Sequence, residues 1–203
     1  MRNRTTLIRT AAIGLATAGL WLGLTQQKPP ADLNVIKIAD DLHVLEGSGG
    51  NVAVYTTNEG VILIDSKFEQ NVPQILDKVK SITSQPVRYM LNTHQHGDHT
   101  GGNARLQAQG VETVAQENAR ANMERGSMPG LPRMTFGDTF SLTLGGKQVR
   151  AYHFGRGHTN GDAFIYFPAR RVLHSGDMFI GGPPFIDYAN GGSGAECVQA
   201  KAD

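Results

Sequence analysis

The N-terminal half of the chain alternates short apolar runs with polar turns. Apolar or β-branched runs occupy residues 35–38, 42–45, 52–57 and 61–65, and Gly, Asn and Asp residues separate them. This spacing is typical of consecutive antiparallel strands. The turn Asn58-Glu59-Gly60 has the composition of a hairpin connection.

After residue 65 the apolar positions recur at helical spacing, which predicts an amphipathic helix over residues 69–82. Pro86 ends the connection, and from there strands and helices are expected to alternate. Further strands are predicted over residues 87–91, 111–114, 139–144, 148–154, 163–167 and 172–175. Further helices are predicted over residues 104–109 and 116–123. The series indicates an α/β or α+β sandwich.

The first 27 residues differ from the rest of the chain. Arg2, Arg4 and Arg9 precede an uncharged apolar run of 14 residues, 11–24. A basic start with a run of this length is typical of an export signal, because a membrane-spanning helix needs about 20 apolar residues. We therefore expect a signal peptide or N-terminal membrane anchor over 1–27, a linker over 28–33 and one domain over 34–203. The protein is expected to be exported, to the periplasm or beyond.

Composition narrows the classes of partner and of metal site. The formal net charge is +1 and no Lys/Arg block occurs, which argues against a nucleic-acid partner. Cys197 is the single cysteine, so the chain can form neither an internal disulfide nor a thiolate cluster. Any metal must therefore be bound by imidazole and carboxylate groups.

The segment T-H-Q-H-G-D-H-T-G-G-N, residues 93–103, follows a predicted strand and holds three of the seven histidines. Loops at the carboxyl ends of strands are where α/β sheets gather ligands. His94 and His96 lie two residues apart, and Gly97 permits a sharp turn before Asp98 and His99. Imidazole and carboxylate suit Zn, Fe or Mn. Because one metal needs three or four protein ligands, four donors in one segment indicate two metals.

Two later turns carry further candidate ligands. His158 lies in G-H-T-N-G-D and Asp177 in S-G-D, each at the end of a predicted strand. Thr159 and Asp162 are interpreted as groups that support a ligand or form the turn. His174 has no assigned role.

The motifs H-Q-H-G-D-H, G-H-T-N-G-D and S-G-D, in this order and spacing, resemble the metallo-β-lactamase superfamily of hydrolases. The resemblance covers the chain from about Val35 onward and implies an αβ/βα sandwich. The implied ligands of one metal are His94, His96 and His158. The implied ligands of the second metal are Asp98 and His99, and the implied bridge between the metals is Asp177.

The aspartate at position 177 refines the resemblance. The best-known antibiotic-degrading members of the superfamily have a cysteine or serine at this position. An aspartate bridge is similar instead to glyoxalase II, lactonases and related esterases.

The resemblance implies two divalent metal ions, zinc with iron or manganese as alternatives. Two cations beside one water lower its pKa from about 15.7 towards 7, which provides a hydroxide nucleophile at neutral pH. We therefore expect a hydrolase that cleaves an ester, thioester, lactone or amide in a small-molecule substrate. Asp98 is the expected catalytic residue, orienting the hydroxide and handling a proton.

The chain departs from the family pattern after the S-G-D turn. Family members continue with a helix, a strand and a closing segment that supplies a last histidine to the second metal. No histidine follows His174 in this sequence. We therefore expect a sandwich that is incomplete at the C-terminus and a second metal that binds more weakly than the first.

Three other functions stay open. A β-lactamase proper fits an exported location. An RNA-processing nuclease carries the same metal motif, but neutral charge and an export segment argue against it. A non-catalytic or truncated metal-binding remnant fits the missing terminal elements. Membrane contact is expected only through the N-terminal anchor.

Overall fold

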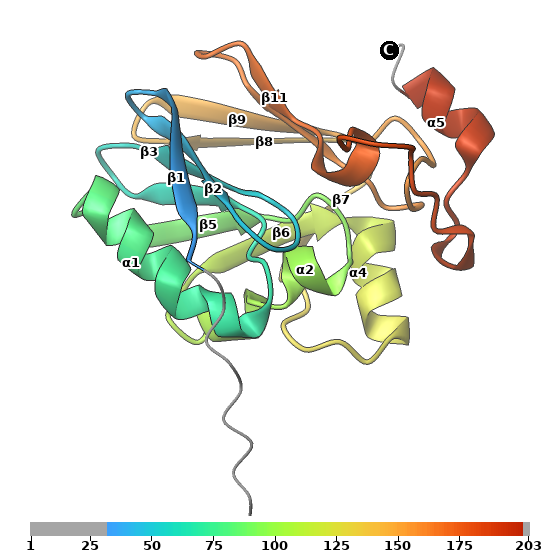
Figure 1. The fold of residues 1–203 in the computed structure, drawn as a ribbon, viewed down its shortest axis with the longest axis horizontal. Coiled ribbons are helices and arrows are strands. Elements are labelled where there is room, and N and C mark those ends of the chain that lie inside the picture. The colour runs from blue at the N-terminus through green and yellow to red at the C-terminus, as the bar shows by residue number, and fades with distance from the viewer. Residues whose placement is uncertain (1–31, 201–203) are drawn as a thin grey trace, which may run out of the picture.

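Two β-sheets pack face to face, and helices lie on the outer side of the larger sheet (Figure 1). The structure is a computed structural model that describes residues 32–200. The signal or anchor predicted over 1–27 lies outside these residues, as does most of the predicted linker. Within the described residues, no helix combines the length and the apolar character needed to cross a membrane.

The larger sheet has seven strands in sequence order, β1 to β7. The first four strands pair antiparallel, and the remaining pairs are parallel. The strands are β1 (Asn34–Ala39), β2 (Leu42–Glu46), β3 (Val52–Thr56), β4 (Val61–Ile64), β5 (Val87–Leu91), β6 (Glu112–Gln116) and β7 (Met134–Phe136). The change from antiparallel to parallel comes at β4, where the predicted helix begins to separate the strands.

The smaller sheet is fully antiparallel, in the order β11-β10-β9-β8. Its strands are β8 (Thr139–Leu144), β9 (Lys147–Tyr152), β10 (Phe164–Phe167) and β11 (Val172–His174). The helices are α1 (Val72–Ile82), α2 (Gly97–Thr100), α3 (Asn103–Gln107), α4 (Glu117–Arg125) and α5 (Gly194–Ala200). Single 3-10 turns are η1 (Glu69–Asn71), η2 (Gly176–Met178) and η3 (Tyr188–Asn190).

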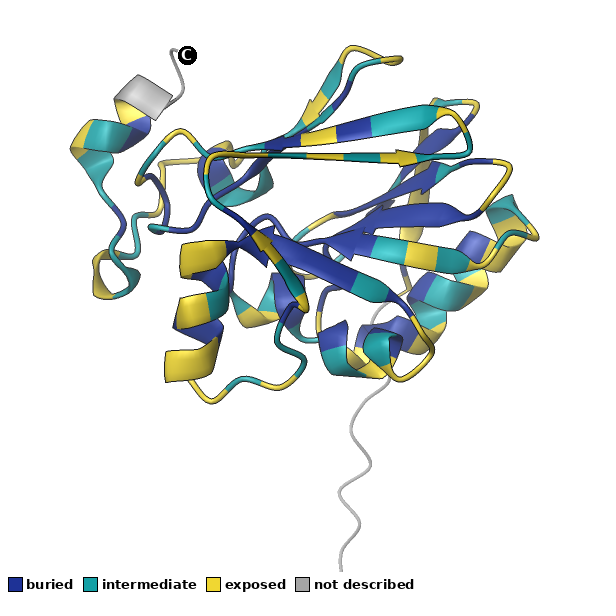
Figure 2. Cartoon of the chain, turned by 180° about the vertical axis from the view of Figure 1, so that it is seen from behind, coloured by how far each residue is buried: buried dark blue, intermediate teal, exposed yellow. Residues whose placement is uncertain are grey.

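Successive side chains of a strand point to opposite faces of the sheet, so the apolar residues of the larger sheet contribute to two separate cores. Leu42 and Tyr55 face the smaller sheet and join the core between the sheets. Leu45 and Val54 point the other way and pack with Ile75 of α1. The buried residues are concentrated in the strands of the larger sheet (Figure 2). The mixed α/β fold expected from the sequence is thereby confirmed.

Most predicted elements form, with small shifts at their ends. The hairpin at residues 58–60 pairs Thr56 with Val61. The helix predicted over 69–82 starts with η1 and becomes α-helical at Val72. The sequence pattern gave no sign of β7, because three residues are too few to show a period. The Gly/Pro-rich loop at residues 126–132 packs on α3, where Asn103 and Gln107 donate to the carbonyl of Gly130.

A charged cluster links the two sheets. Asp41, in the turn between β1 and β2, accepts hydrogen bonds from Lys147 of β9 and from Arg170 in the β10–β11 turn, the latter at 2.6 Å. Burial alone would raise the pKa of the Asp41 carboxyl. The bonds and charges of Arg170 and Lys147 outweigh it and hold that pKa below its usual range.

Replacing Asp41 with asparagine should lower the free energy of unfolding at pH 7 by about 2 kcal/mol, because two cations lose their anion. A carboxyl with a depressed folded pKa stabilises the fold above its unfolded pKa and loses that effect as pH falls through the folded value. The difference between wild type and D41N should therefore persist down to about pH 4 and shrink below it. Urea unfolding at a series of pH values measures this. The exposed neighbour Asp40, paired with Lys37, is the control, and D40N should leave the midpoint unchanged.

Candidate metal centre

Four side chains from three separate turns converge on one point. His94, His96, His158 and Asp177 each offer one ligand atom, and these atoms lie within 4.8 Å of one another. His96 Nδ1 is 3.1 Å from His94 Nε2 and 3.0 Å from His158 Nε2. In a tetrahedral zinc site with bonds of about 2.0–2.1 Å, neighbouring nitrogens lie about 3.3 Å apart. The spacing and the donor chemistry of this first ligand group therefore fit a metal ion.

Thr93, the first residue of the motif, ties the three turns together. Its carbonyl accepts from the amide of Ala163, in the segment that carries His158, at 2.7 Å. Gly176 of the Asp177 turn lies directly against the Thr93 side chain. A Cβ at that position would be 2.7 Å from Thr93 Cβ, so only glycine allows the approach. Gly176 also has a φ of +52°, which favours glycine.

A second ligand group surrounds the imidazole of His99. Its Nε2 atom lies 3.2 Å from Asp177 Oδ1 and 3.6 Å from Asp98 Oδ2. This nitrogen is buried and has no hydrogen-bond partner of acceptable geometry. The other oxygen of Asp177, Oδ2, lies 3.8 Å from His158 Nε2. Asp177 therefore lies between the two ligand groups. A buried polar atom normally has a partner, so the unpartnered Nε2 of His99 is consistent with a role as a metal ligand.

Every imidazole of the two groups has an outer partner, defined here as the group bonded to its other ring nitrogen. The distances are short, between 2.7 and 3.1 Å. The pairs are His94 Nδ1 with Thr93 Oγ1, His96 Nε2 with Asp187 Oδ2, His158 Nδ1 with the Phe185 carbonyl, and His99 Nδ1 with Asp65 Oδ2. Outer partners of this kind fix the tautomer of a ligand imidazole and direct its lone pair at the metal.

The electrostatics of the site place His94 and Asp177, but not His99, in the protonation states that bind metals. Burial, assisted by the neighbouring imidazoles, lowers the pKa of His94 well below its usual value, so this ring is neutral. Burial alone would raise the pKa of Asp177, but the close approach and charge of His99 outweigh it and lower that pKa. Burial would lower the pKa of His99, yet Asp65 and Asp177 raise it to about 10. A metal that binds His99 must therefore displace a proton.

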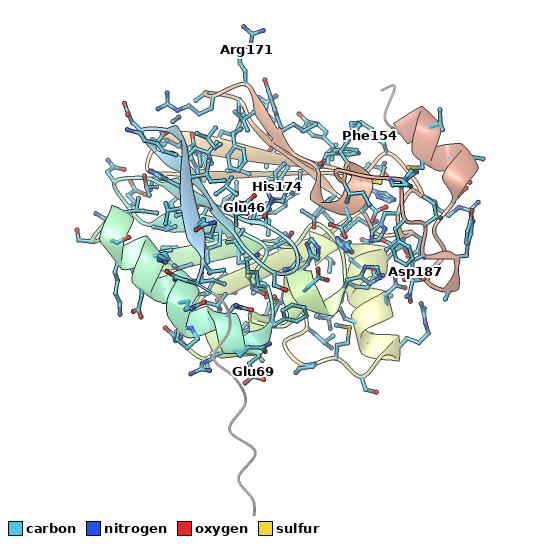
Figure 3. All side chains as sticks on the ribbon, viewed as in Figure 1. Glu46, Glu69, Phe154, Arg171, His174 and Asp187 are labelled. Atoms are coloured by element: carbon cyan, nitrogen blue, oxygen red, sulfur yellow. The ribbon has the colours of Figure 1, made fainter. Side chains whose placement is uncertain are left out.

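Two residues of the site were not singled out in the sequence. Asp65 is fully buried at the end of β4, has a φ of +65° and accepts from the Thr93 amide and hydroxyl as well as from His99. Asp187 lies on the C-terminal segment, where Figure 3 labels it. A buried strand ending directly in an aspartate was the available signal for Asp65. Asp187 had none.

Asp162, interpreted as a supporting or turn-forming residue, forms the turn. It accepts from the Thr159 amide at 2.8 Å and from the Thr159 hydroxyl at 2.7 Å. The outer partner of His158 is the Phe185 carbonyl, from the loop beside Pro183 and Pro184. That loop therefore supports the first ligand group through its backbone.

A cavity of about 400 Å³ opens beside the second ligand group. It lies between the β2–β3 loop, residues 47–51, and the segment that follows β11. His99, Asp177 and His174 contribute polar atoms, and Val44, Leu173, Phe179 and Ile180 contribute apolar ones. His174 lies between the two sheets (Figure 3). Its Nδ1 accepts from the Gly176 amide, and its buried Nε2 has no partner of acceptable geometry.

Comparison with known proteins identifies relatives across the folded part of the chain. A metallo-beta-lactamase type 2 of Elizabethkingia meningoseptica is 26% identical over 178 residues, covering 80% of this chain and 70% of that protein. One from Bacteroides fragilis is 23% identical over 157 residues, covering 72% of this chain and 63% of that protein. The chain thus spans less than two thirds of the second relative.

The fold and the family description agree with these relatives. A solved metallo-beta-lactamase from Pontibacter korlensis superposes with a TM-score of 0.65 at 29% identity, covering 71% of each chain. Residues 45–196 match the family described as the metallo-beta-lactamase superfamily. That match, together with the His/Asp metal-binding group, confirms the resemblance drawn from the three motifs: the chain belongs to the metallo-beta-lactamase superfamily.

Proposed function

We propose that the protein is a metal-dependent hydrolase that cleaves an ester, thioester, lactone or amide bond. The observation that carries the proposal is the arrangement of four imidazoles, each fixed by an outer partner, around Asp177. His94, His96 and His158 would hold one divalent ion, zinc in the first instance. Asp98 and His99 would hold a second, with Asp177 shared. When bound, such ions lower the pKa of a coordinated water and polarise a carbonyl oxygen.

Asp98 is the chain's own candidate for proton transfer. Its Oδ2 atom accepts from the Gly50 amide at 3.0 Å, so the carboxylate is oriented before substrate arrives. Its side chain is about one third exposed, at 29%, and solvent can reach it. The carboxylate is suited to accept the proton of the attacking water at one oxygen and return it to the leaving group.

The cavity beside His99 supports a small-molecule substrate. Its apolar wall can bind a hydrocarbon part of the substrate, while glycine backbone from residues 49–50 leaves room close to the ligands. The N-terminal segment supports export as part of the same proposal.

A second candidate function is β-lactam hydrolysis, because the relatives in two species carry the name metallo-beta-lactamase. The aspartate at position 177 favours the ester, thioester and lactone class instead. Both candidates use the same ligand groups, so only turnover separates them.

A substrate screen tests the proposal. The full chain, loaded with Zn²⁺, Mn²⁺ or Fe²⁺ and checked by elemental analysis, is assayed against an aryl ester, a lactone, a thioester and a chromogenic cephalosporin. We expect turnover of at least one of the first three, abolished by a chelator and restored by metal. Turnover of the cephalosporin alone supports the second candidate. Metal-loaded protein that is inactive on the whole panel would contradict both.

A further inference from the structure

Lys67 is a fully buried lysine beside the candidate metal centre. It follows β4 two residues after Asp65, with a φ of +52° that is uncommon for a residue with a side chain. Its ammonium donates to the carbonyl of Gly50 at 2.5 Å and to that of Ser48 at 3.3 Å. Within residues 32–200 it forms no ion pair with a carboxylate. The buried charge is therefore used to hold backbone carbonyls.

The cost of this arrangement argues for a role beyond packing. An ammonium taken out of water loses hydration that two carbonyls restore only in part. Burial accordingly lowers the pKa of Lys67, while the charges of Asp98 and Asp65 oppose that shift. An apolar side chain of similar length would fill the same space without this cost.

The carbonyls that Lys67 holds belong to the β2–β3 loop, residues 47–51, whose backbone lies directly on the second ligand group. A Cβ on Gly50 would overlap the imidazole of His99, and one on Gly49 would be 2.8 Å from Asp98 Cβ. The Gly50 amide donates to Asp98 Oδ2 at 3.0 Å. The peptide units of Gly50 are thus held on one side by Lys67 and on the other donate to Asp98.

We propose that Lys67 is a positioning residue that pins the β2–β3 loop onto Asp98 and His99 and so fixes the geometry of the second ligand group. Without the ammonium, the loop carbonyls lose their buried donor and the loop moves away from the ligands. The Gly50 amide then no longer orients Asp98. The inference rests on the proposed function only for its effect on turnover, because metal binding and loop order are measurable without a substrate.

The variant Lys67→Met removes the charge and both hydrogen bonds while keeping most of the volume. The matched control is Lys78→Met, which removes a partly buried lysine of α1 that pairs with Asp32, away from the site. Co²⁺ is titrated into each metal-free full-length protein, and the visible spectrum reports the two equivalents separately. In K67M we expect the second equivalent to bind about 10–100-fold more weakly, as for other groups that orient ligands, and the first equivalent to stay within about threefold. K78M should match wild type in both.

Which metal equivalent is weakened distinguishes a positioning role of Lys67 from a general effect on stability. A general destabilisation by K67M would weaken both equivalents together, and that outcome, or an unchanged second equivalent, overturns the proposal. If K67M does not fold, amide hydrogen exchange of the wild-type protein still tests whether the loop is pinned. The Gly50 amide should exchange with solvent at least about tenfold more slowly than the amide of Gly49 in the same loop. Equal exchange of the two amides refutes the pinned loop. Should the substrate screen fail while these results hold, the hydrolase proposal fails and the role of Lys67 stands.

Discussion

Replacing Asp177 with asparagine should reduce kcat/KM of the metal-loaded protein by about 10³-fold or more. Asp177 has a carboxylate oxygen near each ligand group, 3.2 Å from His99 Nε2 and 3.8 Å from His158 Nε2. Asparagine has the same shape but no negative charge, and it offers one oxygen where the carboxylate offers two. Both metals should therefore bind more weakly, and elemental analysis after dialysis should show fewer bound equivalents.

A graded series of aspartates tests whether this effect comes from ligation. Asp187 is the outer partner of the ligand His96 and is not itself a proposed ligand, so D187N should weaken metal binding by about 10–100-fold. Asp138 lies exposed in the turn between β7 and β8, and D138N should behave as wild type. The ligand assignment of Asp177 is wrong if D177N retains two equivalents and turnover within about tenfold of wild type.

Replacing Asp65 with asparagine should reduce kcat/KM by about 10²-fold or more, although Asp65 is not expected to touch a metal. The buried Asp65 carboxylate accepts a hydrogen bond from His99 Nδ1 at 2.7 Å, which keeps a proton on Nδ1 and leaves the lone pair of Nε2 for a cation. Asparagine can present its NH₂ group to Nδ1 instead. The ring proton then moves to Nε2, the nitrogen that faces Asp177, and blocks it as a ligand. Asparagine also tolerates the positive φ at this position, so the backbone is preserved.

Nitrogen NMR of the His99 ring in metal-free D65N distinguishes this mechanism from a loss of stability. The metal-free wild-type ring, with a pKa of about 10, should carry protons on both nitrogens at pH 7, whereas the variant ring should carry its proton on Nε2 only. D41N is the matched control: it removes a buried aspartate that bonds Lys147 and Arg170 and none of the proposed ligands, so it should lower stability while keeping kcat/KM. A D65N protein with normal turnover, or with its ring proton still on Nδ1, would show that Asp65 does not set the tautomer.

Local sequence patterns determined the strands, the long helix and the candidate ligands. Alternation with period two marks strands such as β2 and β3, and a period near 3.6 marks α1. The ligand candidates could be picked out because four of them lie within six residues, at the end of a buried strand. These features depend on neighbours in the chain, so they are visible without a fold.

Only the tertiary structure shows which residues hold the candidate ligands in place. Asp65 meets His99 across 34 residues, Asp187 meets His96 across 91, and Lys67 meets Gly50 across 17. None of these pairs has a characteristic spacing, because each depends on how distant turns pack at one end of the sandwich. The sequence by itself thus determined which residues could bind a metal. Packing decided which nitrogen of each imidazole faces the site, since a tautomer is set by whatever group the fold places on the ring's other side.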